Sequence, residues 1–550
     1  MKLCLISPPM TVASRDGHLP QVPPLGVAYL AASARQAGHE VSIVDGLGEA
    51  LDSYHRFIGT SYMNGLTVDQ VVQRVGRDND LIGLSVMFSK QWPLARRLLS
   101  ALRKEFPATP LVVGGEHVSA ATRHVFQSSP ADYAVIGEGE ETLLQLMETL
   151  GEAKLPDSSA IEGLAFRADR LSHIRANRAL DARPNENVGL CADRGDPDIV
   201  ITRPRQRRRD LDSIPWPAWD LVPIREYIAA NRFQDCSDRR VMVILGTRGC
   251  PYRCRFCSSP QMWTTSFYMR DPRDLVDEME FYMHAYGAAE FQFQDLTFVI
   301  NRNWVIRVAD EIIRRQLDIV WTLPGGTRSE AFDAEVMRRL SASGCTSLTF
   351  APESGSQRVL DDMLKKTNPE RFIELGKIAR QNRINVALHA FIIIGSPEET
   401  LRDLLRTYWF ICRLALVGYD GMLCSRFTCY PGSEYHRRYL DSGLVEYNDD
   451  YFLDLEISFS SLKNSRSWHP RWGARRIKWF ITTAYLLFFV LHYASRPVRV
   501  VRSTAAVLRN RPRTRLEAVF AHSFARRWRR VWNLLGLGGR TADVTGSFSA

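Results

Sequence analysis

Three closely spaced cysteines constrain this chain more than any other feature, because they directly follow an apolar stretch that reads as a strand. Cys250, Cys254 and Cys257 form a C-x3-C-x2-C loop. Such a loop can ligate three irons of a cubane, whereas iron–sulfur clusters otherwise usually take four cysteines. The spacing therefore predicts a [4Fe–4S] cluster with one open iron. Zinc would need a fourth Cys or His nearby, and the next cysteines, Cys236 and Cys345, are poorly placed.

From this loop onward, short apolar strands alternate with helices. The candidate strands are 241–245, 290–293, 319–322, 347–350, 385–394 and 421–427. Six such units predict a partial, TIM-like (β/α)6 barrel over residues 236–440. Its chemistry is expected at the carboxyl ends of the strands.

Residues 1–150 show a separate alternation of strands and helices. The candidate strands are 3–6, 41–44, 81–86, 111–113 and 133–136, with helices such as 26–37 and 94–104 between them. This order predicts an α/β domain with a parallel, doubly wound, Rossmann-like sheet. Ligands of such sheets lie at the carboxyl ends of the strands. The residues found there are Ser85, Met87, Gly114, Gly115, Glu116, Gly137, Glu138 and Gly139.

The remaining parts read as a connecting segment, 151–235, and a helical, basic C-terminal region, 441–550. The connector contains the run Arg205–Arg209, which we interpret as a solvated surface because a nucleic-acid site would interleave aromatic residues. The net charge of +10 is concentrated near the end of the chain. Between Lys463 and Arg540, 18 lysines and arginines stand against Glu517 alone, which gives +17 there and −7 elsewhere.

Cysteine usage and the N-terminus favour a cytoplasmic protein. Residues 1–9 read as a short buried strand and lack the basic n-region and cleavage site of a signal peptide. Seven of the ten cysteines are scattered along the chain, which fits reduced thiols better than a disulfide framework.

The cysteine loop and the strand ends after it resemble the radical S-adenosylmethionine (SAM) superfamily. Pro352–Ser356 (PESGS), Gly395–Glu399 (GSPEE) and Tyr430–Ser433 (YPGS) follow the fourth, fifth and sixth candidate strands in the order of that family. Each motif alone is ordinary turn chemistry, but their order is informative. The resemblance implies that SAM chelates the open iron. It also implies the SAM contacts Phe256, Arg328, Glu353, Ser354, Gly395 and Pro397.

Asp295 lies where the second candidate strand of the barrel ends. Aspartate is a preferred N-cap residue, since its carboxylate accepts hydrogen bonds from the first turn of a helix. We therefore expect Asp295 to cap a helix, with direct contact to a substrate as the alternative.

The N-terminal domain resembles the cobalamin-binding domains of B12-dependent radical SAM enzymes. The resemblance rests on Pro23–Gly26, Gly38–Val41, Val113–Gly115, Gly137–Glu141 and the connector segment Leu211–Pro215. It covers residues 1–440 and implies that the strand-end residues of the N-terminal domain bind cobalamin. The Asp-x-His-x-x-Gly motif is absent, because Asp16 and His18 begin it but Gln21 occupies the glycine position. Without that axial histidine, Met87 or Phe88 is expected to line the lower face of the cobalamin.

The resemblance implies a cobalamin-dependent radical SAM methyltransferase with three cofactors: a [4Fe–4S] cluster, SAM and cobalamin. Methyl would move from SAM via methylcobalamin to an unactivated carbon of a natural-product or lipid-like small molecule, after a 5′-deoxyadenosyl radical has abstracted hydrogen. A flavodoxin- or ferredoxin-type electron donor is the implied partner, and nucleic acid is not expected. One alternative is a non-methylating, ring-forming enzyme like the anaerobic oxidative cyclases. Another, from a different class, is a redox sensor.

The basic C-terminal region begins with an apolar, aromatic stretch, 477–493, that is short for a membrane span of about 20 apolar residues. Arginines follow it at high density. We interpret this region as a helix packed on the barrel with a basic tail. The alternative is peripheral contact with an anionic membrane surface.

Overall fold

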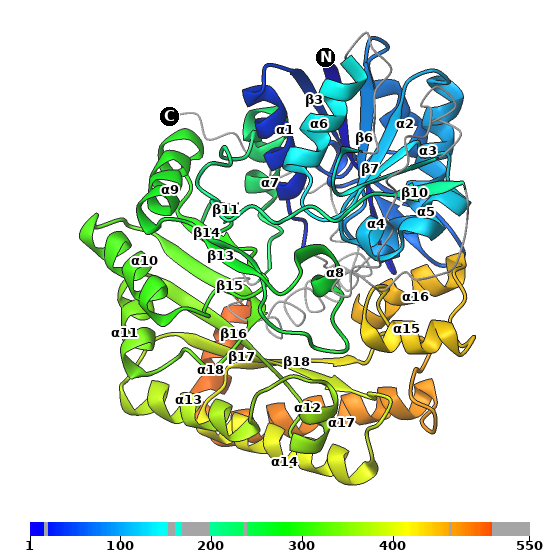
Figure 1. The fold of residues 1–550 in the computed structure, drawn as a ribbon. Helices are drawn as coiled ribbons and strands as arrows, with labels where there is room; N and C mark the ends of the chain where they lie inside the picture. The colour runs from blue at the N-terminus through cyan, green and yellow to red at the C-terminus, as the bar shows by residue number, and fades with distance from the viewer. Residues whose placement is uncertain (16–19, 152–159, 168–197, 235–238, 461–464, 509–550) are drawn as a thin grey trace, which may run out of the picture.

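The structure is a computed structural model that describes all residues except 16–19, 152–159, 168–197, 235–238, 461–464 and 509–550 (Figure 1). Both predicted alternations form separate parallel sheets. In Figure 1 the N-terminal sheet lies at the upper right and the barrel at the lower left.

The N-terminal sheet has the strand order β10-β9-β8-β7-β6-β1-β3. Its strands are β1 Lys2–Ser7, β3 Glu40–Asp45, β6 Leu81–Ser85, β7 Leu111–Gly114, β8 Tyr133–Val135, β9 Leu164–Arg167 and β10 Ile199–Ile201. The first five pair in parallel, which confirms the doubly wound sheet. The direction of winding changes between β1 and β6, where such sheets bind ligands. The antiparallel strands β9 and β10 extend the sheet beyond residue 150.

Helices cover both faces of this sheet. They are α1 Leu25–Gln36, α2 Val68–Arg74, α3 Trp92–Glu105, α4 Glu116–Ala120, α5 Thr122–Ser128 and α6 Glu140–Gly151. Leu3, Cys4, Leu5 and Ile6 of β1 are all buried. A continuous apolar run of this kind is typical of a strand covered on both sides. A small sheet of β2 Met10–Val12, β4 Tyr54–Arg56 and β5 Tyr62–Asn64 stands beside it.

The barrel is an open sheet of six parallel strands in chain order, β11-β14-β15-β16-β17-β18. Its strands are β11 Val241–Ile244, β14 Glu290–Phe293, β15 Val320–Thr327, β16 Cys345–Glu353, β17 Ala387–Ile394 and β18 Gly421–Arg426. Its helices are α9 Pro272–Tyr286, α10 Arg302–Arg314, α11 Ala334–Ala342, α12 Gln357–Asp362, α13 Pro369–Gln381 and α14 Leu401–Val417. The predicted partial barrel is confirmed.

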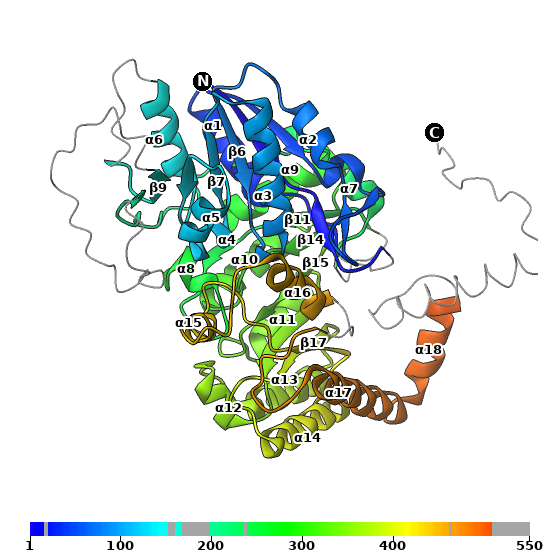
Figure 2. The ribbon, with the colours of Figure 1, turned by 90° about the vertical axis from the view of Figure 1, so that its right-hand side faces the viewer.

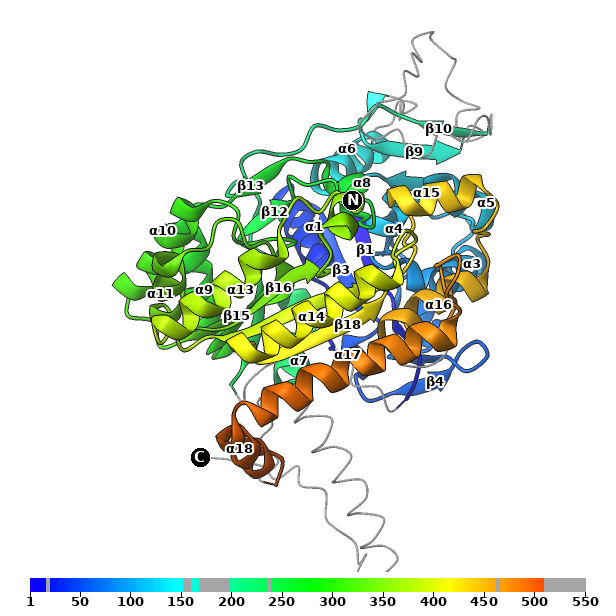
Figure 3. The same cartoon turned by 90° about the horizontal axis from the view of Figure 1, so that it is seen from below.

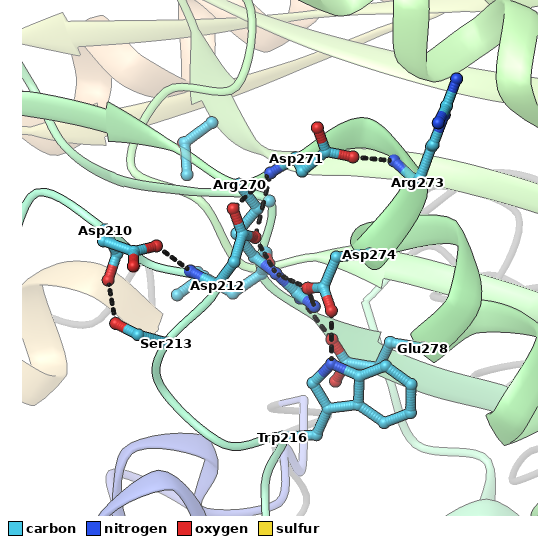
Figure 4. Close-up of polar contacts among 12 residues, drawn as sticks. Asp210, Asp212, Ser213, Trp216, Arg270, Asp271, Arg273, Asp274 and Glu278 are labelled. Carbon is cyan, nitrogen blue, oxygen red and sulfur yellow. Dashed lines mark hydrogen bonds and ion pairs between the residues drawn. The ribbon is translucent and has the colours of Figure 1, made fainter.

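The connector segment Leu211–Pro215 docks on the start of α9 (Figure 4). Asp212 accepts hydrogen bonds at 3.0 and 2.9 Å from the backbone N–H of Asp271. Arg270, whose side chain is 5% exposed, forms ion pairs with Asp274 and Glu278. Trp216 donates from Nε1 to Asp274 at 3.3 Å. The connector is thus part of the packing of the barrel.

The C-terminal helices cover two different surfaces (Figures 2 and 3). They are α15 Glu434–Asp441, α16 Asp449–Ser460, α17 Ala474–Ala494 and α18 Pro497–Leu508. Helix α16 packs on the N-terminal domain, where Lys90 forms an ion pair with buried Glu456. Helix α17 packs on α14 and β18 of the barrel. Within the described ranges, α17 is the single helix long and apolar enough to cross a membrane, and 33% of that stretch is buried.

Three histidines lie where α15 and α16 meet the N-terminal domain, with His117 and His436 buried and His124 partly buried. The ring of His117 lies 5.5 Å from Phe452, and the rings of His124 and His436 lie 4.5 and 5.5 Å from Tyr447. Burial lowers the pKa of His117 to about 3 and those of His124 and His436 to about 4. The aromatic contact therefore requires neutral imidazoles.

Acidification is expected to destabilise this contact. Each histidine has a folded pKa below its unfolded value of 6.5, so its stabilising contribution is complete above pH 6.5 and declines as the pH falls toward 4. Each group contributes a slope of up to about 1.4 kcal/mol per pH unit. In urea unfolding at pH 4.5 to 7.5, H436F should flatten the slope, because it removes one titrating group. The control H284Q, at an exposed site, should leave the slope unchanged. Equal slopes in wild type, H436F and H284Q would contradict the assignment of this pH dependence to His436.

Candidate active site

The cysteine loop joins β12, Thr247–Gly249, to the short helix α8, Ser259–Trp263. Gly249 begins the loop with φ +94°. A Cβ there would lie 2.1 Å from the carbonyl oxygen of Ser266, which directly precedes the strand β13, Phe267–Met269. Only glycine tolerates both conditions. The entry to the cysteine loop is therefore set by backbone contact.

Arg255, between the second and third cysteines, anchors the loop to two helices. Its guanidinium donates to the Asp362 carbonyl at 2.8 Å and pairs with the Asp362 carboxylate at 3.1 Å. It also lies 3.1 Å from Glu434. Its backbone N–H donates to the carbonyl of Met363 at 3.0 Å, and its own carbonyl accepts from the N–H of Tyr435 at 3.2 Å. The loop is thus held between α12 and α15.

All three cysteines are free thiols and are partly accessible. Desolvation raises the pKa of each, for Cys257 to about 11, and each thiol is close enough to another to affect its charge. Within the described residues, no three His, Cys, Asp or Glu side chains gather around a point that could hold one metal ion. A cubane places each thiolate on a different iron, so it does not require such convergence. The free, neighbouring thiols fit a cluster.

Two of the predicted SAM residues, Phe256 in the cysteine loop and Glu353, lie close to Lys365, a residue that sequence reasoning missed. Glu353 ends β16 with φ +64° and forms an ion pair of 2.7 Å with Lys365. Both side chains are 8% exposed. The Lys365 ammonium also lies 5.6 Å from the ring centroid of Phe256. A buried pair next to an aromatic ring and Cys254 concentrates charge where SAM is expected.

Arg328 and Ser354 make contacts within the protein. Arg328 is 5% exposed, donates to the carbonyls of Lys365 and Lys366 at 2.6 and 2.8 Å, and stacks on Tyr252 of the cysteine loop at 3.6 Å. Ser354 is fully buried and shares a hydrogen bond of 3.1 Å with Thr407. The structure thus gives both residues supporting contacts around the loop, and a direct role with SAM stays a prediction.

Gly395 and Pro397 lie in the turn after β17. Gly395 has φ +88°, and its N–H donates to Glu399 at 2.6 Å. Burial raises the pKa of Glu399 to about 7. A Cβ on Gly395 would lie 2.7 Å from Ile477 of α17. The C-terminal helix therefore packs directly against the turn predicted to contact the adenosyl group.

At the carboxyl edge of the N-terminal sheet, the predicted cobalamin residues divide into two groups. Ser85 ends β6, and the side chains of Met87 and Phe88 after it are 42% and 54% exposed. Gly115 has φ +113°, and a Cβ there would lie 2.6 Å from the carbonyl oxygen of Val86. Exposed apolar side chains beside a glycine at this edge fit a large planar ligand. The first group, around Ser85, Met87 and Gly115, is therefore accessible to a ligand at this edge of the sheet.

The second group contacts the barrel domain. Glu116, after Gly114 and Gly115, accepts a hydrogen bond from the hydroxyl of Ser258, which is adjacent to Cys257. Burial raises the pKa of Glu116. Residues predicted at one cofactor site therefore bond directly to the loop predicted at the other.

Glu138 joins the two domains through a buried group of ion pairs. It pairs with Arg207 at 3.0 Å and with Arg248 at 3.2 Å, and Arg248 also pairs with Glu140 at 2.8 Å. These four side chains are 5–11% exposed. The neighbouring glycines fit closely as well, with a Cβ on Gly137 3.6 Å from the Met262 carbonyl. A Cβ on Gly139 would lie 3.0 Å from the Leu30 side chain.

This arrangement corrects our interpretation of the arginine run. Arg205 and Arg207 have side chains that are only 13% and 5% exposed. Arg207 also donates to the carbonyls of Trp263 and Ser266 at 2.9 and 2.6 Å. Arg205 and Arg207 are therefore not part of a solvated surface, because they pair with acidic residues of the N-terminal domain, whereas Arg209 is exposed as expected.

The N-cap interpretation of Asp295 was also wrong. Helix α10 is capped by Asn301. Asp295 instead accepts hydrogen bonds from the N–H of Gly246 at 3.2 Å and from the N–H and hydroxyl of Thr247, both at 2.5 Å. Burial raises its pKa to about 7. Asp295 thus orders the backbone that leads into the cysteine loop.

Of the other sequence observations, Gln21 is a buried structural residue that donates to Leu51 and Asn64 at 2.9 and 2.7 Å. Asp16 and His18 lie outside the described residues. Sequence reasoning missed Lys365, Arg255 and Arg248. The position of Arg248 and Arg255 beside the cysteines was the available signal. The sequence carries no such signal for Lys365. Its partner Glu353 comes close to it only because the chain turns back after α12.

Comparison with family models finds the same two parts. The model described as Radical SAM superfamily matches residues 244–411, and the model described as B12 binding domain matches residues 19–147. Together they span the cysteine loop, the ends of the first five barrel strands and the carboxyl edge of the N-terminal sheet.

Curated relatives extend over most of the chain. The cytidylyl-2-hydroxyethylphosphonate methyltransferase of Streptomyces wedmorensis is 29% identical over 466 residues, 81% of this chain and 83% of the relative. The anaerobic magnesium-protoporphyrin IX monomethyl ester cyclase of Rubrivivax gelatinosus is 25% identical and covers 70% of this chain and 61% of the relative.

A solved structure shares the fold. The radical SAM methyltransferase TsrM from Kitasatospora setae, with cobalamin and a [4Fe–4S] cluster bound, aligns with a TM-score of 0.58. It is 18% identical, and the alignment covers 79% of this chain and 76% of that protein.

Proposed function

This chain is a radical SAM enzyme with an N-terminal B12-binding domain, and from that premise we propose that it is a cobalamin-dependent C-methyltransferase. The two domains imply a [4Fe–4S] cluster, SAM and cobalamin as cofactors. The proposed reaction transfers a methyl group from SAM to an unactivated carbon of a natural-product or lipid-like small molecule. The similarity to a methyltransferase over 81% of the chain supports it.

One contact carries the proposal. The hydroxyl of Ser258, adjacent to Cys257, donates to Glu116 at the carboxyl edge of the B12-binding sheet. A methyltransferase of this type needs its two cofactors to act on one substrate carbon. Direct bonding between the loop of one cofactor and the strand end of the other supports such a shared site.

The chain contributes positioning, charge and exclusion of water, while the bound cofactors supply the radical and methyl-transfer chemistry. Cys250, Cys254 and Cys257 would hold the cluster, and Arg255 would keep their loop in place through α12 and α15. The Lys365–Glu353 pair would orient SAM beside Phe256. Met87 and Phe88 would offer an apolar surface to the cobalamin.

The remaining expectations also belong to the proposal. The proposed domain boundaries are 1–150, 151–235, 236–440 and 441–550, with β9 and β10 of the connecting segment extending the N-terminal sheet. An electron donor of the flavodoxin or ferredoxin type would reduce the cluster. The protein would act in the cytoplasm, with peripheral membrane contact through its basic C-terminus.

A label-transfer experiment tests the function without a known substrate. The full chain is reconstituted anaerobically with iron, sulfide and cobalamin, reduced, and incubated with SAM that carries an isotopically labelled methyl group. The expected result is label in the protein-bound cobalamin, together with 5′-deoxyadenosine from SAM cleavage.

The same experiment separates the alternatives. Cleavage of SAM with no label in the cobalamin would contradict methyl transfer and favour the ring-forming type of enzyme, to which the chain is also similar. Absence of both products in a protein that retains cluster and cobalamin would favour a redox sensor.

A further inference from the structure

We propose that the outward surface of α14 and α17 docks on an anionic lipid membrane. This α14–α17 face consists of Leu401, Leu405, Trp409 and Leu416 on α14 and of Trp479, Leu486 and Val490 on α17. The inference goes beyond the proposed reaction, because it concerns where the enzyme works.

The exposed apolar residues of α14 lie on one side of the helix. Leu401, Leu405, Trp409 and Leu416 are 58%, 58%, 65% and 46% exposed. Their spacing places them within a single stripe. Leu414 and other residues of the opposite side are buried in the barrel core. Helix α14 is thus apolar on its outer side as well as on its inner side.

Helix α17 repeats this arrangement. Trp479, Leu486 and Val490 are 62%, 63% and 55% exposed and share one side of the helix. Ile477 and Phe488 on the opposite side are buried against the barrel. Because its inner side is packed, α17 cannot span a bilayer in this structure. It can lie along the surface of one.

The two stripes belong to one surface. The Tyr408 hydroxyl donates to the carbonyl of Phe480 at 2.9 Å, and Arg496 donates to the carbonyl of Leu416 at 3.3 Å. The helices therefore run side by side in the same direction, as Figure 3 shows. Trp409 and Trp479 are sequence neighbours of the bonded Tyr408 and Phe480, so they lie at the same level. A contiguous exposed apolar surface of this kind marks a site of interaction.

The charged residues around the α14–α17 face indicate which partner it binds. Arg402, Arg406, Arg475 and Arg476 are exposed on the same two helices. The one acidic residue of α14 and α17, Asp403, is buried and paired with Arg358. Tryptophan and leucine flanked by arginine are the composition of helices that lie in the interface of anionic membranes.

The end of the described chain adds to this charge. Helix α18 follows α17 directly and exposes Val500 and Val501, which are 45% and 70% exposed. The 42 residues after Leu508 contain nine arginines against Glu517 and Asp543. Anionic lipid attracts such polybasic sequence, so the apolar face and the adjoining sequence favour the same partner.

Vesicle sedimentation tests the proposal. The full-length protein is mixed with vesicles of phosphatidylcholine alone or with phosphatidylglycerol added. Binding is expected only with phosphatidylglycerol and should weaken with salt. The double variant W409S/W479S should bind about tenfold more weakly, since both tryptophans insert at the interface. Serine and tryptophan have similar helix propensities, so the helices should be retained.

The matched control is F281S, which removes an aromatic residue that is 48% exposed on α9, away from this face. It should bind like wild type. Equal binding of W409S/W479S and wild type would overturn the proposal, as would binding that ignores lipid charge. A wild-type dimer in gel filtration that W409S/W479S converts to monomer would also overturn it, because a second copy would then be the occupant.

Discussion

Replacement of Cys254 by alanine is expected to reduce 5′-deoxyadenosine formation from SAM to the background rate. The three cysteines are the proposed protein ligands of the cluster, and a cubane with two protein ligands is not held in the geometry that leaves one iron open. The measurements are the iron and sulfide content after anaerobic reconstitution and the deoxyadenosine formed under dithionite.

The matched control for this variant is C412A. Cys412 is a free, partly exposed cysteine on α14, so its loss removes a thiol of the same burial class outside the loop. C412A should keep the iron content and the cleavage activity of wild type. A C254A protein with wild-type circular dichroism, full iron content and full cleavage would refute the assignment of the cluster ligands.

Strands and the cysteine loop could be predicted because their signals are local. Buried strands such as Leu3–Ile6 and Val241–Ile244 are continuous apolar runs, and these residues are all 0–4% exposed. The three predicted cluster ligands lie within eight residues. The turns after β16, β17 and β18 likewise carry their motifs within a few positions. A feature that is determined by a few consecutive residues can be predicted from the sequence without knowledge of the fold.

The contacts between the two domains could not be predicted, because their partners are distant in sequence. Glu116 and Ser258 are 142 residues apart, and Glu138 and Arg248 are 110 residues apart. In sequence, glutamates beside strand-end glycines read as ligand contacts. In the structure, Glu138 is paired with buried arginines. Asp295 was mispredicted for a similar reason, since its hydrogen-bond donors, Gly246 and Thr247, lie at the end of a neighbouring strand.

These interdomain contacts have a functional consequence. The Arg248–Glu138–Glu140 group and the Glu116–Ser258 bond fix the cysteine loop relative to the B12-binding sheet. Arg248 is two residues before Cys250. A change in how the domains meet would thus reach the proposed cluster ligands through two residues of backbone, so this group couples stability to the position of the cysteine loop.

R248M is therefore expected to destabilise the chain by about 3–5 kcal/mol, because it leaves buried carboxylates without their partner. In the wild type, burial opposes the ionisation of Glu140, but attraction to Arg248 outweighs it and lowers its pKa. Its stabilising contribution is thus complete above about pH 4.5 and is lost as the pH falls through the lower folded pKa. Urea unfolding at pH 7 measures the deficit.

The pH dependence and a second substitution distinguish this account from a simple packing defect. In R248M the deficit should shrink on acidification toward pH 4.5, since a protonated Glu140 no longer needs a cation. R248M/E140Q should recover part of the loss at pH 7, because neighbouring groups are not additive. R208M, which removes a partly exposed arginine 3.5 Å from Glu141, should cost less than about 1 kcal/mol. A deficit in R248M that is independent of both pH and Glu140 would show that the lost side chain acted through packing alone.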